Sequence, residues 1–337
     1  MGEVARSTSF PTRDFRRLWW GESISTLGST VTLFALSTLV VLTLDGTAQD
    51  VGWLNAARWL PYLVLGLVVG ALVDRCRRRP LLVATDLIRA VVLLAIPIAW
   101  VFDVLSLALV LVVVVVVGTA SLVSDAAFMS LLPRLVPRQH LQQAHARIDT
   151  TSAVAQTAAP ALGGLLVRLV GAPLAVLIDA ASYVVSALTV LTIRTPEPPP
   201  VSSAVPDIVA EIRDGVRWIY RTSGLALLAC ATHLWFVAHA VLGAVIVPYA
   251  LLTVGLDALQ LGVATALAGL GSVVGAVCSS AAGRRLGLGG TIIAAHLSTA
   301  VGVAVMAMAG LGTASWAAAA VLGVGQLLHG VGLGLSN

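Results

Sequence analysis

Long uninterrupted apolar runs constrain this chain more than any other feature. A typical run is "LSLALVLVVVVVVGTASLV" (105–123), and runs of similar length recur along the whole sequence. About 20 such residues in a helix cross the hydrocarbon core of a bilayer. Backbone groups in lipid need internal hydrogen bonds, so only helices or closed barrels span it, and barrel strands alternate in polarity over about ten residues. These runs do not alternate, which predicts an all-α integral membrane protein.

The composition agrees with this assignment and excludes other classes. Of the 337 residues, 58% are hydrophobic and only 11% are charged, whereas soluble proteins carry about 25% charged residues. The net charge is +4, but the arginines are spread over short loops, which argues against a nucleic-acid partner. Cys76, Cys230 and Cys278 lie far apart, so we expect no disulfide and no zinc site. No other metal site and no cofactor is expected.

The apolar runs predict about ten membrane helices, with boundaries uncertain by several residues. The expected spans are 17–44, 51–73, 80–102, 104–124, 141–170, 172–193, 225–252, 258–282, 289–311 and 314–335.

Arginine gathers in alternate connections between these spans. It is dense in the N-terminal tail, in 75–79 and in 134–138, whereas Arg168 is the one arginine near the opposite helix ends. Basic loops stay on the cytoplasmic side of a membrane. We therefore expect a multi-pass protein of the cell membrane with a cytoplasmic N-terminus.

One connection is longer than the others and divides the chain. The Pro-rich stretch "RTPEPPPVSSAVP" (194–206) precedes a segment with apolar residues at helical spacing and arginines on another face, which predicts an amphipathic helix on the membrane surface. The expected organisation is a six-helix half (1–193), a cytoplasmic linker (194–224) and a second, incomplete half of about four helices (225–337).

A dense charge cluster, "GALVDRCRRRP" (70–80), interrupts the apolar sequence. It resembles the loop signature G-x-L-x-D-R-x-G-R-R/K of the major facilitator superfamily, although Arg77 stands where the family has glycine. The matching residues are Gly70, Leu72, Asp74, Arg75, Arg78 and Arg79. The surrounding segment 57–90 is similar to the bacterial efflux branch that includes enterobactin-type siderophore exporters.

The resemblance implies a role for this loop as a latch between the two halves. Gly70 would allow a close helix approach, and Asp74 would face the positive end of a helix in the other half. The alternative is that the arginines only set the topology. A second resemblance lies in "AAPALGG" (158–164), which is similar to the family's antiporter signature. Pro160, Gly163 and Gly164 match it, and a simple proline kink is the alternative there.

Ionisable residues inside spans are costly in lipid and are therefore functional candidates. Asp149 is the expected protonatable group, Arg58 the expected contact with a carboxylate or an anionic substrate, and Glu22 a further candidate. Asp86 and Arg89 are three residues apart and are expected to pair on one helix face. Asp179 is expected near the outer interface, where local pairing explains it.

The function implied by the resemblance is secondary transport by alternating access. The chain is expected to be a proton-coupled exporter of an amphipathic small molecule of the drug or siderophore class, with the bilayer, the substrate and the proton as partners and no obligate protein partner. No nucleophile or paired-carboxylate motif indicates an enzyme. Because the family has twelve spans and about ten are expected here, the alternative is a truncated, non-transporting membrane remnant.

Overall fold

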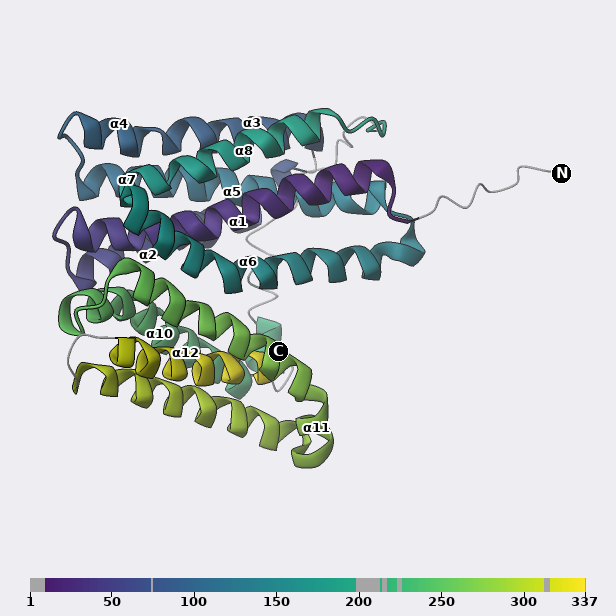
Figure 1. Cartoon of the computed structure of the whole chain (residues 1–337). Coiled ribbons are helices and arrows are strands. Elements are labelled where there is room, and N and C mark those ends of the chain that lie inside the picture. The colour runs from purple at the N-terminus through teal and green to yellow at the C-terminus, as the bar shows by residue number, and fades with distance from the viewer. Residues whose placement is uncertain are drawn as a thin grey trace.

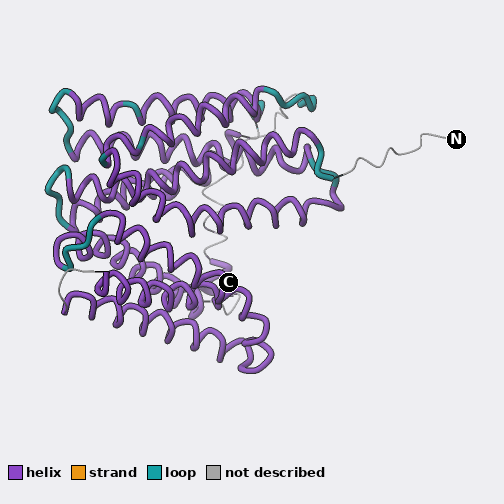
Figure 2. Tube along the Cα trace, in the orientation of Figure 1, coloured by secondary structure: helices purple, strands orange, loops and turns teal. Residues whose placement is uncertain are grey.

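The computed structural model describes residues 10–73, 75–197, 213, 217–222, 226–311 and 316–336. This part of the chain is almost entirely helical and contains no strand (Figure 2). The α-helices are α1 (Arg13–Leu42), α2 (Ala48–Val73), α3 (Arg78–Leu93), α4 (Ala95–Val101), α5 (Leu107–Leu135), α6 (Leu141–Val170), α7 (Ala172–Ala175), α8 (Leu177–Leu191), α10 (Ala226–Pro248), α11 (Ala258–Met308) and α12 (Trp316–Ser336). Short 3-10 or π turns are η1 (Arg138–His140), η2 (Trp218–Thr222), η3 (Tyr249–Thr253) and η4 (Ala309–Leu311).

The predicted helical membrane protein is confirmed. Within the described residues nine segments are long and apolar enough to cross a membrane, and α2 is a further helix of 26 residues. The expected span 141–170 coincides with α6. By contrast, α5 continues to Leu135 instead of ending near residue 124. The reason is that Asp125 faces a cavity inside the protein and so does not end the span.

Local sequence explains where several helices begin and end. Thr12 caps α1 by accepting a hydrogen bond from the Phe15 backbone N–H at 3.2 Å. Asp257 and Gln260 form a capping box at the start of α11. Gly171 ends α6 with a φ of 85°, a left-handed conformation that glycine adopts without strain. The two expected spans 258–282 and 289–311 both lie in α11, which is broken at Gly287, where φ is 70°.

The helices pack as two bundles. The first bundle comprises α1 to α8 and the second comprises α10 to α12, in which α11 folds back at Gly287 and packs along α12. In Figure 1 the bundles approach each other on the left and diverge toward the right. The right end holds the start of α1 and the connections 75–77 and 136–140. We call it the arginine-rich end and the opposite one the far end.

The two bundles contact each other mainly at two places: α6 packs against α11, and α2 packs against α10. A Cβ atom at Gly164 would overlap the carbonyl of Ala258, and one at Gly262 would overlap the carbonyl of Pro160. The backbones of α6 and α11 therefore touch directly at this crossing. Nearer the far end, Arg168 Nη1 lies 3.7 Å from Asp257 Oδ2.

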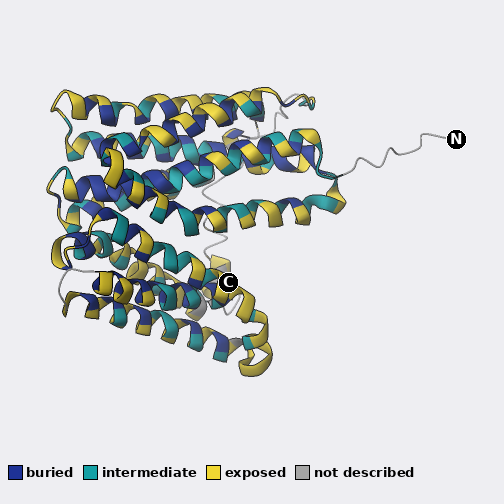
Figure 3. Ribbon diagram, viewed as in Figure 1, coloured by how far each residue is buried: buried dark blue, intermediate teal, exposed yellow. Residues whose placement is uncertain are grey.

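Burial follows the faces on which helices meet (Figure 3). Two buried apolar clusters fill the interior, one around Leu39 and Leu93 and the other around Phe15 and Leu131. Large apolar side chains also point outward, for example Leu63 and Leu311, each 85% exposed. A bilayer covers such surfaces, which are too extensive for a protein in water.

Candidate functional site

A cavity of about 680 Å³ lies inside the first bundle and faces α10 of the second. Its walls come from α1, α2, α3, α5, α6 and α8, and His239 of α10 is the residue that the second bundle contributes. Five charged side chains line it: Glu22, Arg58, Arg89, Asp125 and Asp179. Charged groups in the membrane interior are expensive, so their concentration around one cavity marks it as the candidate site.

The wall between α1 and α8 is built from small and hydroxyl residues. Gly28 of α1 leaves room for the side chains of Ser182 and Asp179 on α8, which would overlap a Cβ atom placed there. Ser182 Oγ donates to Asp179 Oδ1 at 3.0 Å, and Ser29 Oγ donates to the same oxygen at 3.4 Å. Close helix approach through small residues is typical of membrane bundles. The close approach of α1 and α8 buries Asp179, of which only 1% is exposed.

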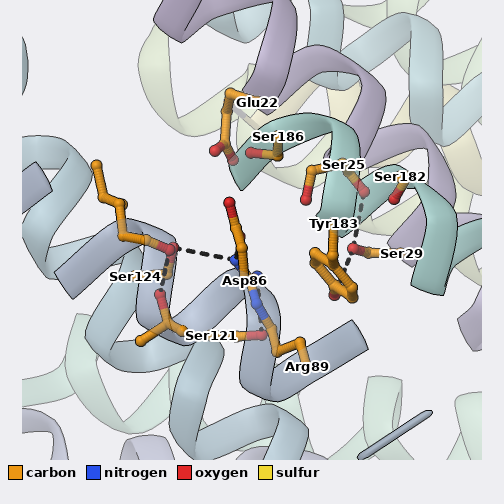
Figure 4. Close-up of polar contacts among 12 residues, drawn as sticks. Glu22, Ser25, Ser29, Asp86, Arg89, Ser121, Ser124, Ser182, Tyr183 and Ser186 are labelled. Carbon is orange, nitrogen blue, oxygen red and sulfur yellow. Dashed lines mark hydrogen bonds and ion pairs between the residues drawn. The ribbon is translucent and has the colours of Figure 1, made fainter. Parts of the chain in front are cut away.

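Arg89 of α3 also lines the cavity and contacts two neighbouring helices, α5 and α8 (Figure 4). Its guanidinium pairs with Asp86 one turn earlier, which confirms the pair expected from their spacing. Arg89 also donates to Ser124 Oγ of α5 at 3.1 Å and lies 4.1 Å from the centre of the Tyr183 ring on α8. Ion pairing and cation–π contact together stabilise this buried charge, although the Nε atom of Arg89 is buried without a hydrogen-bond partner among the described residues.

A second polar pair lies on the α2–α5 side. Tyr62 OH donates to Asp125 Oδ2 at 2.8 Å. The Trp59 ring lies 5.4 Å from the Tyr62 ring, and the Arg58 guanidinium lies 5.2 Å from the Trp59 ring. This side of the cavity therefore combines an aromatic surface with one acidic and one basic group.

The second bundle contributes a stack of rings. The His239 ring is stacked with Trp235 at a centroid distance of 5.0 Å and with His329 of α12 at 5.5 Å. His329 is buried, whereas His239 is exposed to the cavity.

The structure brings only some of the predicted site residues together. Glu22 and Arg58 both line the cavity. Asp149, the expected protonatable group, does not: it is exposed and is not a wall residue. Helix α6 begins at Leu141, as expected, so the error concerns the helix face. Ser152 and Gln156 of α6 line the cavity, whereas Asp149 lies on a face that does not.

Asp179 also differs from expectation. It lies in the first turn of α8, but it is buried against α1 and hydrogen-bonded to serine hydroxyls instead of forming an ion pair near the helix end. Asp125 and Tyr62 were not predicted. The signal for Asp125 was the apolar stretch "AAFMSLLPRL" (126–135) that follows it, which shows that the span does not end at this acidic residue.

The predicted motifs are separate from the cavity. Pro160 and Gly164 form the backbone crossing with α11, and Gly163 packs on Phe34 of α1; α6 continues through Pro160 as one helix. Asp74 of the predicted latch lies outside the described residues. A Cβ atom at Gly70 would meet no described atom within 4 Å, so the close approach expected there is not formed in this conformation and stays a prediction.

Comparison with known proteins decides the family. The model of the Major Facilitator Superfamily matches residues 18–337, nearly the whole sequence. The chain belongs to the major facilitator superfamily. Members of this family are transporters, and the fold and the interior cavity agree with that assignment.

Macrolide efflux protein A of Streptococcus pyogenes is 26% identical over 226 residues, which are 66% of this chain and 55% of that protein. The multidrug efflux pump Tap of Mycolicibacterium fortuitum is 27% identical over 209 residues, covering 60% of this chain and 51% of the pump. The chain thus spans about half the length of the curated relatives it matches.

A solved bacterial homologue of the iron transporter ferroportin shares the fold at 17% identity. In its inward-facing state the TM-score is 0.71, with 96% of this chain and 82% of that one covered. In its outward-facing state the TM-score is 0.57, at 18% identity with 96% and 82% covered.

Proposed function

We propose that this major facilitator chain exports an amphipathic small molecule across the cell membrane in exchange for protons. The observation that carries the proposal is the cavity of about 680 Å³ with both acidic and basic residues in its walls. Its size fits a drug-sized ligand, and its aromatic side offers Trp59 and Tyr62 to apolar parts of that ligand. The relatives named as macrolide and multidrug efflux proteins favour a drug over a siderophore.

Alternating access between the two bundles is the proposed mechanism. The halves are 1–193 and 225–337, joined by the linker 194–224. We assign the arginine-rich end to the cytoplasm, with a cytoplasmic N-terminus, because basic loops are retained there. The bundles touch through Gly164 and Arg168 toward the far end, and this conformation would therefore open to the cytoplasm. The higher similarity to an inward-facing relative supports the same assignment.

The loop with Asp74, Arg75, Arg78 and Arg79 remains our proposed latch of the opposite, outward-open conformation. In the inward-open conformation the backbone of this loop contacts Glu197. The backbone N–H groups of Arg78 and Arg79 donate to the two carboxylate oxygens of Glu197 at 2.7 and 2.8 Å. Asp74→Asn should reduce transport without reducing the amount of folded protein in the membrane. Unchanged transport would leave the arginines as topology determinants only.

Ethidium transport into inside-out membrane vesicles tests the main proposal. With the vesicle lumen acidified, vesicles that contain the full chain should take up ethidium, and a protonophore should release it. Vesicles without the chain provide the baseline. No uptake above this baseline for ethidium, a macrolide and a neutral dye would contradict the proposed export function.

A further inference from the structure

We propose that Asp179 is the residue that binds the coupling proton, at the wall between α1 and α8. This inference rests on the proposed proton-coupled function and assigns a residue to it. It replaces Asp149, which is exposed and away from the cavity.

The surroundings of Asp179 favour a neutral carboxyl group. Its hydrogen-bond partners are the hydroxyls of Ser182 and Ser29, at 3.0 and 3.4 Å from Oδ1. Hydroxyl groups stabilise an anion far less than a cation does, and a buried carboxylate without a cation partner takes up a proton instead. Asp179 also lines the cavity, so water there gives the proton a route in and out.

The charges on neighbouring helices leave Asp179 without its own counter-ion. On α3, Arg89 is paired with Asp86 and lies against the Tyr183 ring. On α1 the titratable residue facing this region is Glu22, an acid. Arg58, Asp125 and His239 line the same cavity from α2, α5 and α10, and the adjoining α7 has the sequence APLA, with no ionisable side chain.

A chain of contacts connects Asp179 to the paired cation. Ser29 Oγ lies 2.9 Å from Tyr183 OH and also donates to Asp179, and Arg89 lies on the face of the Tyr183 ring. When the Asp179 O–H bond breaks and the proton passes to cavity water, the new anion interacts with Arg89 through Tyr183 and Ser29. Deprotonation thereby changes the contacts among α1, α3 and α8, which are three of the helices that line the cavity.

The other two buried acids fit the role less well. Asp86 has Arg89 as its direct partner, and an ion pair keeps a carboxylate charged. Glu22 is only partly buried, and its described hydrogen bond is from Thr26 Oγ1 at 3.4 Å. Glu22 is therefore the strongest competitor and has to be included in the test.

Infrared spectroscopy of the full chain in lipid vesicles tests the assignment without requiring a substrate. A protonated carboxyl gives a C=O stretching band that disappears on deprotonation, so spectra are recorded from acidic to alkaline pH. In the wild type we expect one titrating band from the membrane interior. Asp179→Asn should remove it, whereas Asp103→Asn, in the exposed connection after α4, should leave it unchanged.

Ser182→Ala is a second, independent test, which remains available if the Asp179→Asn protein does not fold. This variant removes one hydroxyl donor to Asp179 Oδ1 and should shift the frequency of the same band. A band that persists in Asp179→Asn, fails to shift in Ser182→Ala, or disappears instead in Glu22→Gln would overturn the assignment.

Ethidium uptake then separates this assignment from the proposed function. If the wild type takes up ethidium, Asp179→Asn should lose at least tenfold in proton-driven uptake, and unchanged uptake would overturn the assignment. If the wild type moves no probe but the band titrates and depends on Asp179, the export function fails while Asp179 remains the proton-binding residue.

Discussion

Arg168 near the end of α6 forms an ion pair with Asp257, the N-cap of α11, with 3.7 Å between Nη1 and Oδ2. The pair connects the two bundles near the end where they are in contact. Its side chains are 54% and 48% exposed, so solvent screens the attraction.

We expect this pair to bias the conformation rather than to hold the fold. Exposed pairs contribute about 0.2–1 kcal/mol, so Arg168→Ala should leave thermal unfolding nearly unchanged. Arg168→Ala should change the ratio of the inward-open to the outward-open conformation by at most about fivefold. The change should be smaller at high salt. Alkylation of a cysteine introduced at Asn55, which contacts Gly243 across the bundles, reports that ratio. Equal alkylation with and without Arg168 would contradict the bias.

Gly164→Ala should destabilise the protein, because its methyl group would overlap the carbonyl of Ala258. Overpacking of this kind costs about 1–3 kcal/mol. Gly70→Ala is the matched control: space is open there, and alanine is the better helix former by about 0.5–1 kcal/mol. Thermal unfolding of the purified full chain in detergent compares them. Equal melting temperatures would mean that the backbone contact of α6 with α11 is not needed for stability.

Trp59→Ala should weaken probe binding, and Trp53→Ala should not. Both side chains belong to α2 and both are 56% exposed, but only Trp59 lines the cavity. Loss of an aromatic contact of about 0.5–1.5 kcal/mol corresponds to a roughly two- to tenfold higher KM. The measurement is the ethidium concentration dependence of uptake into vesicles. Similar KM values for the two variants would place the probe elsewhere.

Asp14→Asn should loosen the start of the linker. The Asp14 carboxylate accepts hydrogen bonds from the backbone N–H groups of Arg194 and Thr195 at 3.0 and 2.8 Å, and from Thr195 Oγ1 at 2.7 Å. An amide in its place is a weaker acceptor. We expect several-fold faster tryptic cleavage after Arg194, followed by mass spectrometry. Asp45→Asn, in the connection between α1 and α2, is the control. Identical cleavage rates would show that the carboxylate does not restrain this segment.

Sequence periodicity and apolar length were enough to predict the helices, because in lipid each span must satisfy its own backbone. The Asp86–Arg89 pair was predictable for a similar reason, since its geometry lies within one helix turn. Tyr62 and Asp125 were not predictable, because they are 63 residues apart and meet only when α2 packs on α5. The burial of Asp179 likewise depends on Gly28, a residue of another helix.

The contact of α6 with α11 through main-chain atoms at Gly164 and Gly262 has an evolutionary consequence. The charged and aromatic groups of the cavity lie on α1, α2, α3, α5, α8 and α10, and they contribute nothing to this crossing. If the chain transports a small molecule as proposed, substitutions in the cavity can change which compounds bind without altering the crossing of α6 with α11. Ligand preference can then diversify in evolution while the contact between the two bundles is retained.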